Sequence, residues 1–173
     1  RTHGFVTSAR WWSAMTEVRL NDTTPADLVE LAPRLQPADL AEVLAVGFPT
    51  ALAGLKASLE NSEYSFTARF DGELAVVWGL APYEVDGGLG AMRKGIVWAL
   101  TTDAVRRHPM TFFRHGKPAV ELLLEVCGEL VQWVDARHAA ALRWVRHLGF
   151  KVAPPAPYKA SGQPFCFVSL RRA

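Results

Sequence analysis

The feature that most constrains the fold is a strand, helix, strand order in the second half of the chain. Gly95–Thr102 is an apolar run short enough to be a buried strand, and Glu129–Val134 is a second strand. Between them, Ala119–Val126 has a helical pattern, and Pro118 is suited to be its first residue. The residues from 103 to 118 are expected to be irregular or a broken helix. Strands joined by such a crossover must be parallel, with a right-handed connection.

A hairpin precedes this unit. Residues Tyr64–Phe70 alternate apolar and polar side chains, as a half-buried strand does. Asp71-Gly72 follows, a dipeptide that favours a type I′ turn because both of its residues tolerate positive φ. Glu73–Leu80 then returns as a more buried strand. Because hairpin strands are antiparallel, the whole sheet is expected to be mixed.

The remaining elements fit around this sheet. Thr24 and Pro25 are a helix-start signal, and Pro37 restarts a helix whose apolar positions are Leu40, Val43 and Leu44. Further elements are predicted as a strand over 16–20, a helix over 52–59, a helix in 135–150 and a closing strand over 163–170. The predicted fold class is α/β, with a mixed central sheet and helices on both faces.

Length and composition bound the function. The chain has 173 residues, and its net charge of +2 does not favour nucleic acid as a partner. Residues 1–14 are interpreted as an extension or an expression remnant, and 15–173 as a single domain. The cysteines, Cys127 and Cys166, lie in apolar surroundings and are expected to be buried, reduced thiols. No run of 18 apolar residues occurs, so no membrane span is expected.

The stretch DARHAAALRWVRHLGF, residues 135–150, has the pattern of an amphipathic helix. Leu142, Val145 and Leu148 share one face, and Gly149 is suited to end the helix in a left-handed conformation. This stretch and the element order over residues 16–170 resemble the GNAT superfamily of N-acetyltransferases. That resemblance implies an acetyl-CoA cofactor. In this chain His138 stands where the family has Asn, and Val145 stands where many active members have the Tyr that protonates the departing thiolate.

A narrower likeness is to the GNAT-like internal virion and assembly proteins of short-tailed (podovirus) phages. Three stretches carry it: VRLNDTTPADLVEL, IVWALTTDAVRRHPMTFFR and LVQWVDARHAAALRWVRHLGF. The resemblance implies virion or assembly proteins as partners, self-association, and a location in the host cytoplasm during assembly or in the virion. An exposed apolar patch would serve such contacts. Its candidates are Trp11, Trp12, Phe112 and Phe113.

The resemblance also indicates where acetyl-CoA would bind. The family's phosphate-binding loop is matched best by residues 114–119, in which Arg114, Gly116 and Ala119 fit the pattern. Lys117 replaces the central Gly, and Pro118 removes one backbone N–H donor. The other candidate contacts to the cofactor are Trp98, Leu100, Thr101 and His138. These departures predict a degenerate cofactor site.

If catalysis persists, a carboxylate must take a proton from the attacking amine. The candidates for this base are Glu84, Asp86 and Asp103, and those for the acid are Tyr83 and Tyr158. The histidines lack zinc-motif spacing, so no metal is predicted. Two functions stay open at this point: a phage assembly component with a degenerate acetyl-CoA site, and an active N-acetyltransferase for an unknown amine.

Overall fold

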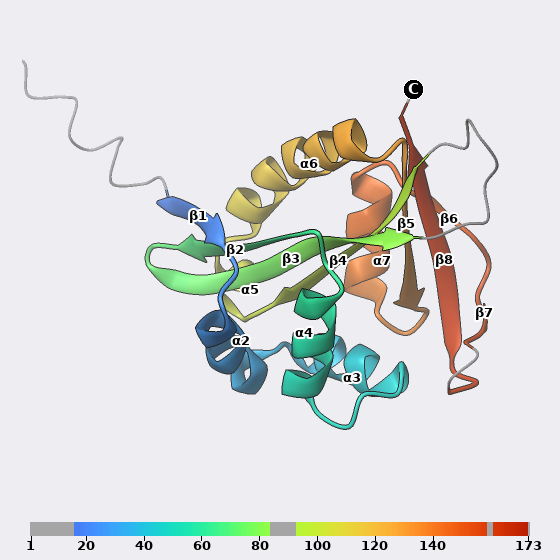
Figure 1. Cartoon of the computed structure of the whole chain (residues 1–173), viewed down its shortest axis with the longest axis horizontal. Coiled ribbons are helices and arrows are strands. Elements are labelled where there is room, and N and C mark those ends of the chain that lie inside the picture. Colours follow the sequence, from blue (N-terminus) through green and yellow to red (C-terminus); the bar gives the residue numbers. More distant parts are fainter. Residues whose placement is uncertain (1–15, 84–92, 159–160, 173) are drawn as a thin grey trace, which may run out of the picture.

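A computed structural model describes residues 16–83, 93–158 and 161–172, and it shows one mixed sheet with helices on both faces (Figure 1). The strands run in the order β1-β2-β3-β4-β5-β8-β6, and β7 pairs with β8. The strands are β1 (Val18–Asp22), β2 (Tyr64–Phe70), β3 (Glu73–Tyr83), β4 (Lys94–Thr101), β5 (Glu129–Asp135), β6 (Lys151–Val152), β7 (Ala156–Pro157) and β8 (Pro164–Arg171). The α-helices are α2 (Pro25–Leu31), α3 (Pro37–Ala45), α4 (Ala51–Glu60), α5 (Ala104–Arg107), α6 (Pro109–Val126) and α7 (Ala139–His147).

The predicted hairpin and the predicted crossover are both confirmed. Strand β2 pairs with β3 in antiparallel orientation, and the turn residues Asp71 and Gly72 have φ values of 49° and 82°. Strand β4 pairs with β5 in parallel orientation. The predicted start of α2 is also correct, because Thr24 caps the helix and forms a reciprocal capping box with Asp27, and Pro25 is the first helical residue. The fold class predicted from the sequence is therefore the observed one.

Two apolar layers hold the helices on the sheet. On one face, α2 and α4 pack through Leu28, Leu31 and Leu55 onto β3 and β4. On the other face, α6 and α7 pack against β5 and β8. The side chains of that second layer include Val120, Leu123, Leu130, Leu142 and Val168. Burial of these side chains supplies most of the free energy that favours folding. Cys127 and Cys166 are buried and unpaired, as predicted.

Helix α6 differs from its prediction. Residues 103–118, expected to be irregular or a broken helix, form the second of these: the short helix α5 and the first half of α6, with a break at His108. Pro118 lies inside α6 rather than at its start. An internal proline costs a helix about 3 kcal/mol. Burial offsets this cost, because Phe112, Gly116, Ala119 and Leu123 fall on one face of α6 and line the protein interior.

Gly116 is a point of close packing between α6 and α7. A Cβ atom there would lie 2.2 Å from the ring of Trp144, which stacks on Phe112 and meets Phe113 edge-on. Because these rings hold Trp144 in place, we expect Gly116→Ala to lower the free energy of unfolding by about 1–2 kcal/mol. This loss is expected although alanine favours a helix more than glycine does. Urea denaturation measures this loss. In a Trp144→Leu background the same change should be neutral or stabilising, and equal losses in both backgrounds would contradict the contact.

Candidate active site

The central feature of the site is a gap in the sheet between β4 and β5. The two strands pair only over Lys94–Ile96 and Glu129–Val131. Beyond these three pairs, β4 continues to Thr101 and β5 continues to Asp135, and the described residues place no strand between them. The sheet therefore opens toward the carboxyl ends of its two parallel strands.

Helix α3 closes the wide end of this gap with two carboxylates. Asp39 Oδ2 accepts hydrogen bonds from Thr101 N at 2.7 Å and from Thr101 Oγ1 at 2.6 Å. Glu42 Oε2 accepts one from Asp135 N at 3.2 Å. Because residues 39 and 42 are three apart, both side chains leave α3 on one side. One helix thus holds the ends of both separated strands.

The free edge of β4 directs backbone groups into the gap. Thr101 N donates to Asp39, and Thr101 O accepts from Gln36 N at 3.0 Å, so both groups point away from β3. Backbone direction alternates along a strand, so Val97 and Ala99 also direct their N–H and C=O groups away from β3. These two residues line the cavity described below. The gap therefore offers a ladder of backbone donors and acceptors to a ligand.

His138 links α7 to this arrangement. Its Nδ1 accepts a hydrogen bond from Ala141 N at 3.3 Å, so it caps the start of α7, and its Nε2 lies 2.8 Å from Asp39 Oδ1. With Nδ1 as acceptor, the proton is assigned to Nε2, which donates to Asp39. The hydrogen bond to Asp39 raises the pKa of His138. Asp39 is buried and accepts from three donors, so it has a structural partner for each of its oxygens.

Glu42 has a different environment. It is half-buried, and its desolvation raises the pKa of its carboxyl group to about 7, against the lowering effect of the Asp135 N–H. Asp135 nearby stays acidic, because its hydrogen bond with Arg137 lowers its pKa. A carboxyl group that titrates near neutral pH is suited to accept and release a proton. Glu42 is therefore the group at the gap best suited to be a general base.

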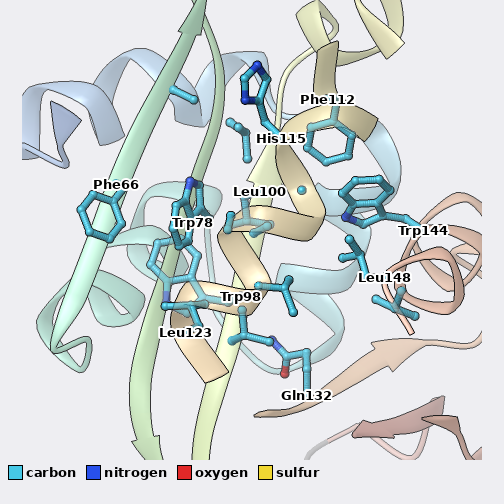
Figure 2. A pocket seen from close by; sticks show the side chains of 18 of the residues that line it. Phe66, Trp78, Trp98, Leu100, Phe112, His115, Leu123, Gln132, Trp144 and Leu148 are labelled. Atoms are coloured by element: carbon cyan, nitrogen blue, oxygen red, sulfur yellow. The ribbon is translucent and has the colours of Figure 1, made fainter. Parts of the chain in front are cut away.

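A cavity of about 790 Å³ opens beside the gap, between the sheet on one side and α6 and α7 on the other (Figure 2). Its walls are mostly apolar and aromatic. Phe66, Trp78, Phe112 and Trp144 are among the lining side chains, and Asp39, Glu42 and His138 line it too. The cavity thus connects the carboxylates of α3 with an apolar chamber under α6.

Solved structures of acetyltransferases have the same arrangement of elements. An acetyltransferase of Bacillus subtilis in complex with CoA is similar with a TM-score of 0.61 and 12% identity, covering 92% of this chain and 100% of that one. The fold is that of the GNAT N-acetyltransferases. The ribosomal-protein-S18-alanine N-acetyltransferase of Escherichia coli has a TM-score of 0.57 at 17% identity, covering 90% of this chain and 94% of its own.

An aminoglycoside N(6′)-acetyltransferase of Legionella pneumophila has a TM-score of 0.60 at 7% identity, covering 91% of this chain and 95% of its own. No protein-family model matches the chain, and no curated protein matches it in sequence. These identities are low, so the likeness concerns the GNAT fold.

The GNAT fold places the predicted cofactor residues in three groups. Thr101 and His138 meet through Asp39 at the gap. Trp98 and Leu100 belong to the apolar layer of α2 and α4, and the Trp98 indole donates to Ser62 Oγ at 2.8 Å, although both side chains also reach the cavity wall. The third group is Arg114, Gly116, Lys117 and Ala119.

The expectation that residues 114–119 form a phosphate-binding loop is wrong, because they lie inside α6. Their backbone N–H groups lie in the interior of the helix, not in a loop that enters one. Gly116 and Ala119 face the cavity, whereas Arg114 and Lys117 are exposed on the outer part of α6. The helix that follows β4 and α5 begins instead at Pro109.

The predicted catalytic residues do not gather at the gap. Glu84 and Asp86 lie outside the described residues. Asp103 is exposed and pairs with Arg106 and Arg107. Tyr83 packs edge-on against Trp133, and Tyr158 packs against Phe165. Val145, which the sequence resemblance matched to the family's Tyr, lines the cavity with an apolar side chain.

Sequence reasoning missed Asp39 and Glu42. It assigned Leu40, Val43 and Leu44 to the buried face of α3, but Leu44 is 46% exposed and Asp39 is buried beside Val43. The available signal was the spacing of Asp39, Glu42 and Val43, which puts two acids on the face of a buried apolar residue. Acids on such a face indicate a functional or hydrogen-bonded site more often than a solvated one.

Two kinds of feature are absent from residues 16–83, 93–158 and 161–172. Within them, no cluster of three or more His, Cys, Asp or Glu side chains is arranged to hold a metal ion. No described helix has both the length and the apolar character needed to cross a membrane.

Proposed function

We propose that this protein is an N-acyltransferase that uses a CoA thioester and an amine acceptor. The observation that carries this proposal is the gap between β4 and β5, with a free β4 edge on one side and Glu42 at its end. The neighbours with acetyltransferase names and the same fold support it. The sequence of events follows from the residues around the gap.

The thioester arm of CoA fits this site. Its amide groups match the N–H and C=O groups that Val97 and Ala99 direct into the gap, and its flexible chain matches the apolar cavity wall. The phosphate end fits less well. Helix α6 begins with Pro109, which has no N–H, and Phe112 N donates to His108 O at 3.2 Å. We therefore expect CoA binding to depend more on the arm than on the diphosphate.

When bound, the thioester supplies an activated acyl carbon. The acceptor enters from the α3 side, where the negative charges of Asp39 and Glu42 favour an ammonium ion. Glu42 takes one proton from it, and the free amine forms the new C–N bond while the C–S bond breaks. Since Val145 cannot donate a proton, the second proton of the amine nitrogen passes through water to the departing thiolate. Asp39 keeps the gap open and acts as a positioning residue.

Isothermal titration calorimetry with acetyl-CoA tests the proposal. We expect a Kd below about 1 mM. Ala99→Trp fills the gap and should abolish the binding, whereas Ala140→Trp, at an exposed position of α7, should leave it unchanged. Thiol release in the presence of a panel of primary amines tests transfer. Binding weaker than about 1 mM, or equal binding by both variants, would end the proposal.

The phage assembly role with a degenerate cofactor site stays a prediction from the sequence resemblance. Of its candidate contacts, Phe112 stacks within the protein on Trp144, Phe113 is 41% exposed, and Trp11 and Trp12 lie outside the described residues. Met110, which is 72% exposed, extends the apolar surface around Phe113. Sedimentation of the protein with purified particles tests this role.

A further inference from the structure

The cavity extends well beyond the gap where acyl transfer would occur. From Val97 and Ala99 it continues between α6 and the part of the sheet formed by β1, β2 and β3. The sheet contributes Leu20, Phe66, Ala68, Phe70, Val76 and Trp78 to this region, and α6 contributes Ala119, Leu122, Leu123 and Val126. In Figure 2, Phe66 and Trp78 lie on neighbouring strands and Leu123 on the helix facing them. This region is called the side chamber below.

The side chamber is apolar, and its polar neighbours lie at its margins. Asp39, Glu42, Gln132 and His138 come from α3, β5 and the start of α7, where the gap is. His115 and Glu125 belong to α6 and are exposed, so they lie at the outer edge. Leu20 and Leu122 also line the chamber, yet they are 54% and 62% exposed. Apolar side chains that stay in water at the mouth of an apolar chamber are typical of a binding site for an apolar group.

We propose that the side chamber binds the alkyl chain of a medium-chain acyl donor, such as a decanoyl thioester. This inference rests on the proposed function, because it places the acyl carbon at the gap and the chain in the chamber. With an acetyl donor, water would fill the side chamber, and contact between water and these apolar walls is unfavourable. A chain that fills it removes both its own methylene groups and the walls from water. The total cavity volume, about 790 Å³, lies within the range of sites for ligands of that size.

The charges of the site indicate that the alkyl chain in the side chamber belongs to the acyl donor and not to the acceptor. The acidic side chains stand on α3, at the end of the gap, and attract the ammonium group there. The side chamber runs from the gap under α6, away from the α2 and α4 layer that shares α3's side of the sheet. The donor, whose chain is uncharged, suits the chamber.

The test compares the Kd values of acetyl-CoA, hexanoyl-CoA and decanoyl-CoA below their micellar concentrations. A fully buried methylene improves affinity by about fourfold. If about three of the additional methylene groups of decanoyl-CoA are fully buried, it should bind at least about 30-fold more tightly than acetyl-CoA. Leu122→Lys places a charge at the mouth of the chamber and should weaken decanoyl-CoA binding by about tenfold or more, with acetyl-CoA binding unchanged. Val29→Lys, on the equally exposed surface of α2, is the matched control and should change neither.

A second variant probes the inner wall. Ala68→Met narrows the chamber and should weaken decanoyl-CoA more than acetyl-CoA, and urea denaturation shows that it is folded. The inference is overturned if acetyl-CoA binds and the longer esters bind no more tightly, a result that leaves the proposed function standing. It is also overturned if Leu122→Lys and Val29→Lys change the Kd of decanoyl-CoA equally. The same holds if decylamine occupies the chamber and decanoyl-CoA does not. If no CoA ester binds at all, the proposed function itself is wrong.

Discussion

Replacing Glu42 by Gln is expected to reduce acyl transfer at pH 8 by about 10²–10⁴-fold. Glutamine keeps the size of the side chain and an oxygen that can accept from Asp135 N, but it cannot take a proton from the amine. The donor Kd should therefore stay the same while kcat falls. Glu60→Gln, at an exposed position at the end of α4, is the control and should have full activity. A fall of less than tenfold would show that Glu42 is not the base.

The pH profile gives Glu42 a second readout. Desolvation raises its pKa to about 7, so the group is protonated and inactive as a base below that pH. We expect kcat/KM for the native protein to rise with pH through about 7 and then level off. The residual activity of Glu42→Gln should lack this rise. The native protein and Glu42→Gln are both assayed with an acceptor amine whose own pKa lies outside this pH range. Titration of the acceptor then does not produce the same curve.

Replacing Asp39 by Ala is expected to cause the largest loss of stability, about 3–5 kcal/mol in the free energy of unfolding. The change leaves Thr101 N, Thr101 Oγ1 and His138 Nε2 without their acceptor in a buried place. Asp39→Asn should lose less, because its amide keeps one acceptor oxygen. Asp22→Ala, at an exposed position of β1, should change stability by less than about 0.5 kcal/mol.

Urea denaturation at pH 7.5 measures these differences. A loss below about 1 kcal/mol for Asp39→Ala would show that the carboxylate does not hold β4 and α7 together. Acetyl-CoA binding by the folded fraction is informative as well, because the gap needs both strand ends in place. We expect Asp39→Ala to weaken that binding even where the protein is folded.

The parts of the fold that sequence predicted well are those with strong local signals. Asp71-Gly72 determines the β2–β3 turn because few other dipeptides accept positive φ twice, and Thr24 with Asp27 determines the start of α2. The start of α6 was predicted too late, at Pro118, because this proline and the polar run around Arg114 argue locally against a continuous helix. The packing of Phe112 and Gly116 against Trp144 of α7 outweighs these local signals. Because this contact joins residues far apart in the chain, no local pattern in the sequence reveals it.

The site was harder to predict than the fold. The acceptors Asp39 and Glu42 meet donors at positions 101, 135 and 138, so no local window of the sequence contains the arrangement. The sequence resemblance singled out His138, but its role as a helix cap and as a donor to Asp39 needed the fold. Asp103 was a reasonable candidate from its place after a strand, yet its neighbours Arg106 and Arg107 neutralise it at the surface.

The short pairing of β4 with β5 has a mechanical consequence. Three residue pairs join two half-sheets, β1 to β4 and β5 to β8, and everything beyond that seam depends on side chains. A rotation of one half-sheet about the seam changes the width of the opening without breaking any strand pair within either half. The width of the opening is therefore set by two carboxylate contacts and by helix packing, and not by the hydrogen-bonded ladders within each half.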